Sequence, residues 1–208
     1  MRSADASPRK RPPDGPYRLV LTGGPGGGKT TAADLFRREI GERVVVVPEA
    51  ATLLFSGGFP RLEDPGARRA AQRTIYELQR NLEDVQSAHY PERMLLCDRG
   101  TVDGAAYWPG EPQGYFEEVG TTLEDELGRY DAVLFFESAA VGGIRIEGGN
   151  LVRTEDVAEA AALDGKLRAL WRRHPRFSLI PHTQSFLQKI GYGLLVLQRI
   201  VEQLGSQG

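Results

Sequence analysis

Residues 23–30 read GGPGGGKT and match the phosphate-loop pattern G-x-x-x-x-G-K-[ST] over its full length. In this pattern the glycines let backbone N–H groups curve around an anion, while the lysine reaches the outer phosphates and the threonine hydroxyl ligates Mg²⁺. A strand-like run precedes the loop at 17–22, and residues 31–40 carry apolar side chains at helical spacing. The order strand, loop, helix therefore predicts a site for a nucleoside triphosphate and Mg²⁺.

The residues expected to bind the nucleotide lie mostly in and just after this loop. Thr183 joins them because it follows the last predicted strand, where the base of a nucleotide would lie. We expect ATP, since the chain has no Asn-Lys-x-Asp run of the kind that ordinary GTPases use, but GTP stays open. The predicted nucleotide-binding residues are Gly24, Gly26, Gly27, Gly28, Lys29, Thr30, Thr31 and Thr183.

Short apolar runs alternate with helical patterns along the rest of the chain. This alternation predicts a three-layer α/β fold of the P-loop NTPase kind, with a five-stranded, mostly parallel sheet and helices on both faces. Ligands of such a sheet bind at the carboxyl ends of its strands. The predicted strands are 17–22, 43–47, 94–98, 132–136 and 177–180, and the predicted helices are 31–40, 64–88, 100–107, one ending near 127 after an exposed loop at 108–114, 154–173 and 185–204.

Length and composition favour one cytoplasmic domain. The chain has 208 residues, which suits a single domain at 17–208, and residues 1–16 are rich in Pro, Ser and charges and predict a flexible tail. A net charge of −2 does not suit a protein that coats nucleic acid or anionic lipid. Cys97 has no partner for an internal disulfide, and no run is long and apolar enough to span a membrane. The oligomeric state stays open, a homodimer included.

Charged residues directly follow the predicted strands, where they face the nucleotide. Asp98 ends the third strand and is expected to hold Mg²⁺ beside the Thr30 hydroxyl, although an acid there also caps a following helix. The next residue, Arg99, suits a bidentate grip on substrate, or alternatively an ion pair with Asp98 or Asp103. The predicted metal ligands are therefore Thr30 and Asp98.

Glu49 follows the second strand and is the candidate base. In small-molecule kinases of this layout a carboxylate at this place faces the acceptor hydroxyl, where it accepts a proton or orients the group. The alternative is a first-turn acid that is favoured by the dipole of a helix beginning at Ala50.

Two further segments have a functional and a purely structural interpretation. The stretch from about 139 to 154 has glycine pairs on both sides of Arg145 and predicts a lid that brings Arg145 or Arg153 onto the triphosphate, unless it is an ordinary surface loop. Gln72, Tyr76 and Gln79 share one helix face, which suits either recognition of an acceptor or packing.

The chain resembles the small AAA-type P-loop family that joins the ribosylnicotinamide kinase domain of bacterial NAD-regulator proteins with the GTP-binding part of the TRPL translocation defect protein. The resemblance covers nearly the whole folded chain. More distantly, the pair Asp98-Arg99 is similar to the acid-arginine pair of thymidylate and deoxynucleoside kinases, where it serves metal and substrate. The segments that carry the family resemblance are 21–31, 47–50, 72–79, 97–100, 130–133 and 152–156.

The resemblance implies nucleotide binding and, beyond it, phosphoryl transfer to a small acceptor. Our first hypothesis is a Mg²⁺-dependent kinase of a small hydroxylated metabolite, nucleoside-like or nucleotide-like. The second is a nucleotide-dependent switch or NTPase module without an acceptor. The residues predicted to act in catalysis are Lys29, Glu49, Asp98, Arg99 and Arg153.

Overall fold

Five parallel strands form one sheet in the order β2-β3-β1-β4-β5. The computed structural model describes residues 15–142 and 154–205, and the strands in it are β1 (Arg18–Thr22), β2 (Val44–Val47), β3 (Met94–Asp98), β4 (Ala132–Phe136) and β5 (Phe177–Ile180). All residues of β1 and β4 are buried, as is usual for central strands of a parallel sheet that is covered on both faces. The predicted α/β architecture is confirmed.

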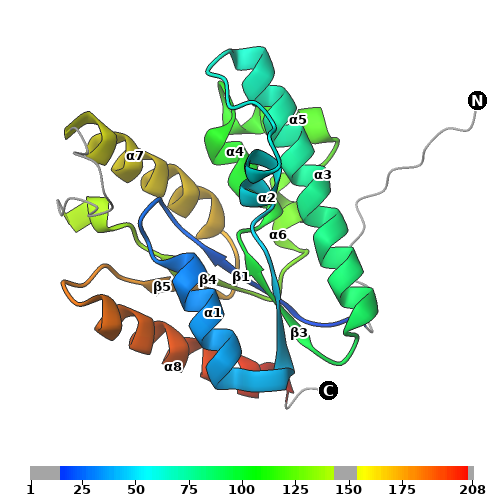
Figure 1. Cartoon of the computed structure of the whole chain (residues 1–208), viewed down its shortest axis with the longest axis vertical. Helices are drawn as coiled ribbons and strands as arrows, with labels where there is room; N and C mark the ends of the chain where they lie inside the picture. The colour runs from blue at the N-terminus through cyan, green and yellow to red at the C-terminus, as the bar shows by residue number, and fades with distance from the viewer. Residues whose placement is uncertain (1–14, 143–153, 206–208) are drawn as a thin grey trace, which may run out of the picture.

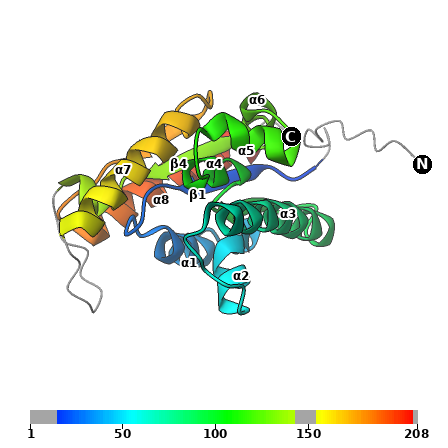
Figure 2. The ribbon, with the colours of Figure 1, turned by 90° about the horizontal axis from the view of Figure 1, so that it is seen from above.

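Helices cover both faces of this sheet. One apolar cluster packs α1 and α8 on one face of the sheet. A second cluster packs the helices α3, α4, α5, α6 and α7 on the other face. Figure 1 shows α1 and α8 side by side, and Figure 2 shows α1 on the side of β1 opposite to α4 and α7. The helices are α1 (Lys29–Ile40), α2 (Ala50–Ser56), α3 (Pro65–His89), α4 (Gly104–Tyr107), α5 (Pro112–Val119), α6 (Leu123–Leu127), α7 (Thr154–Trp171) and α8 (Phe186–Gly205), with short 3₁₀ turns η1 (Gly41–Arg43), η2 (Thr101–Asp103) and η3 (Ala139–Gly142).

The strand order places the end of β1 at a topological switch point. The chain leaves β1, skips one position to form β2, and returns through α3 to insert β3 between them, whereas β4 lies on the other side of β1. Connections therefore diverge at the carboxyl end of β1, where open parallel sheets bind their ligands. The phosphate loop follows Thr22 and so lies in this crevice.

The region between α3 and β4 differs from the prediction. The loop expected at 108–114 is short, because α5 already begins at Pro112, and the single helix expected up to 127 is two helices, α5 and α6. Trp108 is only 7% exposed and packs on the ring of Tyr115 at a centroid distance of 5.7 Å, so the prediction of an exposed loop was wrong for Trp108, whereas Gly110 and Glu111 are exposed. The sequence around Trp108 is polar and therefore predicted exposure. The aromatic contact forms only in the folded chain.

Two predicted features lie outside the described residues. They are most of the tail at 1–16 and the centre of the proposed lid, including Arg145 and Arg153. None of the helices in the described part of the chain combines the length and the apolar character needed to cross a membrane.

Candidate active site

The phosphate loop turns sharply away from β1 because three of its glycines, Gly23, Gly26 and Gly28, have positive φ angles that other residues rarely adopt. Gly23 has a φ of +134°, and a Cβ there would lie 2.0 Å from the carbonyl oxygen of Phe136. Gly28 has a φ of +83° and precedes α1, and a Cβ there would lie 2.5 Å from the ring of Phe186. No side chain makes a capping hydrogen bond at the beginning of α1. The positive end of the helix dipole therefore faces the loop without a side-chain cap. This end of α1 is suited to an anion.

Lys29 lies beneath the loop because it is the first residue of the buried stripe of α1. The stripe continues through Ala32, Ala33, Phe36 and Ile40 at helical spacing, and Lys29 itself is 7% exposed. Its Nζ donates to the carbonyl oxygen of Gly24 over 2.8 Å. Burial and, after it, repulsion by Arg99 lower the pKa of Lys29 to about 7, although the nearby carboxylates act in the opposite direction. An anion would therefore be a more favourable partner for the Lys29 ammonium than the neutral Gly24 carbonyl.

Thr30 and Asp98 meet as the sequence predicted for a metal site. The Thr30 hydroxyl donates to Oδ2 of Asp98 over 2.8 Å, and Thr30 is exposed whereas Asp98 is 3% exposed. The other carboxylate oxygen, Oδ1, is buried and has no hydrogen-bond partner among the described residues. Burial raises the pKa of Asp98, an effect that the Thr30 hydrogen bond opposes. A free carboxylate oxygen beside a solvent-facing hydroxyl fits a hard divalent cation.

Such a cation would depend on ligands from outside the chain. Among residues 15–142 and 154–205 no group of three His, Cys, Asp or Glu side chains is arranged to hold a metal by itself. This agrees with the way Mg²⁺ binds in phosphate-loop proteins, where phosphates and water complete its shell.

Arg99 is held by two carboxylates directly after β3. Its Nε donates to Oε1 of Glu49 over 2.5 Å, and its Nη1 donates to Oδ2 of Asp103 over 2.9 Å. Asp103 also accepts hydrogen bonds from the Thr22 hydroxyl and from Nε1 of Trp171, over 2.9 and 2.6 Å. Arg99 has a φ of +74°, the only positive value among the described residues other than glycine. The two ion pairs hold the guanidinium group of Arg99 in place.

Glu49 precedes α2, a short helix that begins at Ala50 as the alternative interpretation of Glu49 assumed. It is the N-cap residue, but its side chain makes no capping bond to the backbone and instead accepts from Thr52 Oγ1 over 2.5 Å and from Arg99. Burial pushes the pKa of Glu49 upward, but Arg99, Thr52 and Lys29 together outweigh it, so the pKa lies below its usual value. Glu49 is thus ionised at neutral pH and can accept a hydrogen bond.

A cavity of about 360 Å³ opens beside these charges. Glu49, Arg99 and Asp103 line it at the strand ends, and α2, α3 and α4 supply most of the rest. The face of α3 with Gln72, Tyr76 and Gln79 belongs to its lining. The other lining residues are Ala50, Ala51, Phe55, Pro60, Arg61, Leu62, Glu63, Ala67, Arg68, Ala71, Ile75, Gly100, Thr101, Gly104, Tyr107 and Tyr115.

The backbone of the loop is supported by two buried charged side chains that the sequence analysis missed. Asp164 of α7 accepts from the amides of Gly24 and Ser138 over 2.8 and 2.9 Å. Lys189 of α8 donates to the carbonyl oxygens of Gly27 and Glu137 over 2.9 and 2.6 Å, and burial lowers its pKa to about 8. Both residues lie far along the chain from the loop, and nothing in their local sequence marks them.

The remaining predicted nucleotide residues have the following environments. Gly26 and Thr31 are exposed at the loop and on the first turn of α1. The Thr183 hydroxyl donates to the carbonyl oxygen of Ser185 over 2.8 Å and so supports the turn before α8. Arg153 lies outside the described residues.

Solved structures share this fold. A thymidylate kinase from Ehrlichia chaffeensis superimposes with a TM-score of 0.55 at 15% sequence identity, over 90% of this chain and 99% of that chain. No curated protein is a significant match to this sequence. The structural likeness at this identity establishes the P-loop kinase-like fold.

A family model described as an AAA domain matches residues 18–186, which span every element from β1 to the beginning of α8. The match includes the phosphate loop and both strand ends that carry Glu49, Asp98 and Arg99. The chain belongs to this family of AAA domains, designated AAA_28, and is one of its small P-loop members.

Proposed function

We propose that this protein is a Mg²⁺-dependent kinase that transfers the γ-phosphoryl group of ATP to a hydroxyl group of a small, nucleoside-like metabolite. The observation that carries the proposal is the direct connection between the phosphate loop and the cavity. Asp103 bonds both Thr22, the last residue before the loop, and Arg99, which lines the cavity with Glu49. A triphosphate on the loop and an acceptor in the cavity would meet at this point.

The loop end has the groups that bind and neutralise a triphosphate. The free end of α1 and the Lys29 ammonium face the loop, and Thr30 with Asp98 would hold Mg²⁺. When bound, Mg²⁺ neutralises charge on the phosphates. Lys29 would exchange the Gly24 carbonyl for a phosphate oxygen and hold the transferred group in place.

The strand-end part of the cavity suits an uncharged hydroxyl better than a phosphate. There the carboxylates Glu49 and Asp103 line the cavity with one cation, Arg99, whereas Arg61, Arg68 and Glu63 belong to other parts of the lining. Arg99 is also engaged by two of these carboxylates, so it has little capacity to anchor an acceptor phosphate. A hydroxyl, in contrast, can donate to ionised Glu49. Although the thymidylate kinase of similar fold acts by its name on a phosphorylated acceptor, we assign an alcohol acceptor to this chain.

Label transfer tests the function directly. The protein is incubated with Mg²⁺ and γ-labelled ATP or GTP against nucleosides, their monophosphates and vitamin-like alcohols. We expect label on the hydroxyl of an alcohol and preference for an unphosphorylated nucleoside over its monophosphate. Label on the phosphate of a monophosphate would contradict the alcohol assignment, and label appearing only as slow free phosphate would support the switch or NTPase hypothesis.

Nucleotide binding is expected to take up a proton above pH 7. Burial and Arg99 lower the pKa of Lys29 to about 7 before nucleotide binds, and adjacent phosphates would raise it again. Between these two values the complex holds about one more proton than the free protein, so affinity falls by up to about tenfold per pH unit. Titration calorimetry of Mg²⁺-ATP in buffers of different ionisation enthalpy measures the proton number. Lys29→Met should reduce the uptake, and buffer-independent heats at pH 8 for the unmodified protein would contradict the prediction.

A further inference from the structure

Gln79 lies at the floor of the cavity and has one polar atom without a partner. The residue is 3% exposed, and it lines the cavity together with Tyr76 and Thr101. Its Nε2 donates to Oε1 of Glu83 over 3.1 Å and to the carbonyl oxygen of Arg99 over 3.3 Å. No residue in the described part of the chain donates to its oxygen, Oε1. This oxygen is not fully buried, so it is accessible from the cavity that Gln79 lines and can accept a hydrogen bond from a ligand.

A buried polar network fixes which way the Gln79 amide points. Both partners of its NH₂ group accept hydrogen bonds: one is a backbone carbonyl and the other is the Glu83 carboxylate. Glu83 is 0% exposed and bonds the guanidinium groups of Arg18 and Arg129 over 3.1 and 2.7 Å, and it also accepts from the Tyr130 hydroxyl. A flipped amide would direct oxygen at oxygen, so Oε1 must point away from Glu83.

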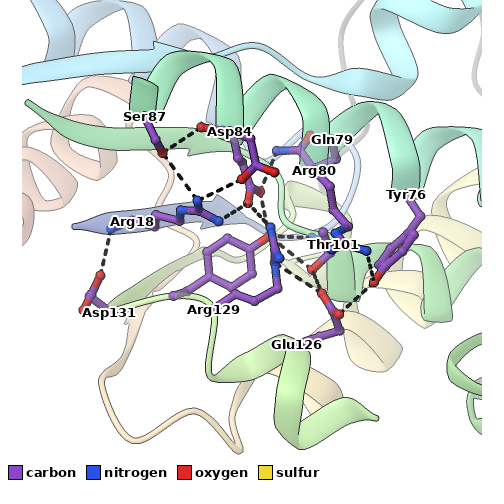
Figure 3. Close-up of polar contacts among 12 residues, drawn as sticks. Arg18, Tyr76, Gln79, Arg80, Asp84, Ser87, Thr101, Glu126, Arg129 and Asp131 are labelled. Atoms are coloured by element: carbon purple, nitrogen blue, oxygen red, sulfur yellow. Dashed lines mark hydrogen bonds and ion pairs between the residues drawn. The ribbon is translucent and has the colours of Figure 1, made fainter. Parts of the chain in front are cut away.

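Figure 3 shows the polar contacts of this network. Gln79 projects from α3 beside Arg80, and Arg18 from β1 lies between Asp84 and Asp131. Glu126 joins the Tyr76 and Thr101 hydroxyls over 2.9 and 2.6 Å. These hydroxyls are thus committed to Glu126 as donors, which leaves Gln79 Oε1 as the fixed acceptor at this floor.

The rest of the lining suits a flat ring. Phe55, Ile75 and Tyr107 contribute apolar or aromatic surface, and several alanines and glycines leave room between them. Pockets of this kind bind rings through their faces and select them through a few fixed polar atoms.

From these contacts we propose that Gln79 determines acceptor specificity by accepting a hydrogen bond from an N–H group of the acceptor. The inference rests on the proposed function and names the substrate class: a nucleoside-like alcohol whose ring or carboxamide presents an N–H donor. The hydroxyl of this compound lies at Glu49, and its N–H lies at Gln79 on the cavity floor.

The test compares accepted alcohols with counterparts in which the N–H is methylated. For each nucleoside or ribosyl carboxamide that the protein phosphorylates, kcat/KM is measured beside its N-methyl form, for example uridine beside 3-methyluridine and inosine beside 1-methylinosine. We expect methylation to lower kcat/KM by at least about tenfold, because the methyl group removes the donor and keeps water away from the Gln79 oxygen. Equal values for both forms, or transfer only to alcohols without an N–H, would overturn the proposal.

Two variants separate the hydrogen bond from a steric effect of the methyl group. In Gln79→Met the ratio between the two forms should shrink to within about threefold, since the acceptor atom is gone and the side-chain length is kept. Gln86→Met is the matched control, because Gln86 lies two turns further along α3 and outside the cavity lining, and it should keep the full ratio. A full ratio in a folded Gln79→Met variant would also overturn the proposal.

The outcome distinguishes this proposal from the function on which it rests. If Gln79→Met does not fold, the comparison of methylated and unmethylated compounds with the unmodified protein still decides. Label released only to water contradicts the kinase itself, whereas phosphorylation of an alcohol that lacks an N–H contradicts only the role of Gln79.

Discussion

Lys29→Met is expected to lower kcat/KM for phosphoryl transfer by roughly a thousandfold, because it removes the one loop cation that would hold the transferred group as charge develops on it. Lys29 makes a single hydrogen bond, to Gly24, and methionine can occupy the same channel beneath the loop. The rate is measured under subsaturating acceptor with Mg²⁺-ATP, and the melting temperature is measured in parallel.

The melting temperature should stay constant or rise in this variant. The pKa of Lys29 is about 7 in the folded protein against 10.5 for an ordinary lysine, so folding opposes its charge. The resulting cost is fully present below pH 7 and disappears as the pH rises toward 10.5. The stability gained by Lys29→Met should therefore be largest near pH 6 and smallest near pH 10.

A second lysine provides the control. Lys166 is exposed on α7, and Lys166→Met should leave both the rate and the melting temperature unchanged. Retention of a tenth or more of the activity by folded Lys29→Met would contradict the role of the loop in catalysis.

The fold was predictable because its decisive signals are local. The phosphate loop and the β-branched strands occupy continuous segments, and burial on both faces makes residues 19–21 of β1 and all of β4 apolar. The pairing of Thr30 with Asp98 also followed from position, since the carboxyl ends of neighbouring parallel strands meet at one edge.

The supports of the site were not predictable in the same way. Asp164 and Lys189 bond backbone atoms of the loop from helices more than a hundred residues away, and the sequence has no pattern that encodes such contacts. The helix α2 entered only as the alternative interpretation of Glu49, because its seven residues are too few for a clear apolar period.

The role of Gln79 was also not predictable from the sequence alone. Helical spacing placed it on one face with Gln72 and Tyr76, but the same spacing also suits packing. Only the network around Glu83 distinguishes the two, because it fixes the amide nitrogen and leaves the oxygen for a ligand.

Glu49→Gln is expected to lower kcat for transfer by about a hundredfold and to leave nucleotide binding nearly unchanged. Glutamine keeps the size of the side chain and an acceptor for Arg99, but it removes the charge that would orient the acceptor hydroxyl and receive its proton. We choose the lower end of the range for general bases because Arg99 and Thr52 hold the pKa of Glu49 below its usual value despite its burial, which makes it a weak base.

Separate measurements distinguish catalysis from a structural role of Glu49. Calorimetry gives the affinity for Mg²⁺-ATP, single-turnover transfer gives the rate, and thermal unfolding reports on α2. Glu77→Gln, on the exposed side of α3 and outside the cavity lining, is the matched control and should behave as the unmodified protein. A lower melting temperature with an unchanged rate would show instead that Glu49 serves α2 through the helix dipole. In that case the acceptor hydroxyl would have to be activated by its position alone, which is sufficient when the transition state is loose.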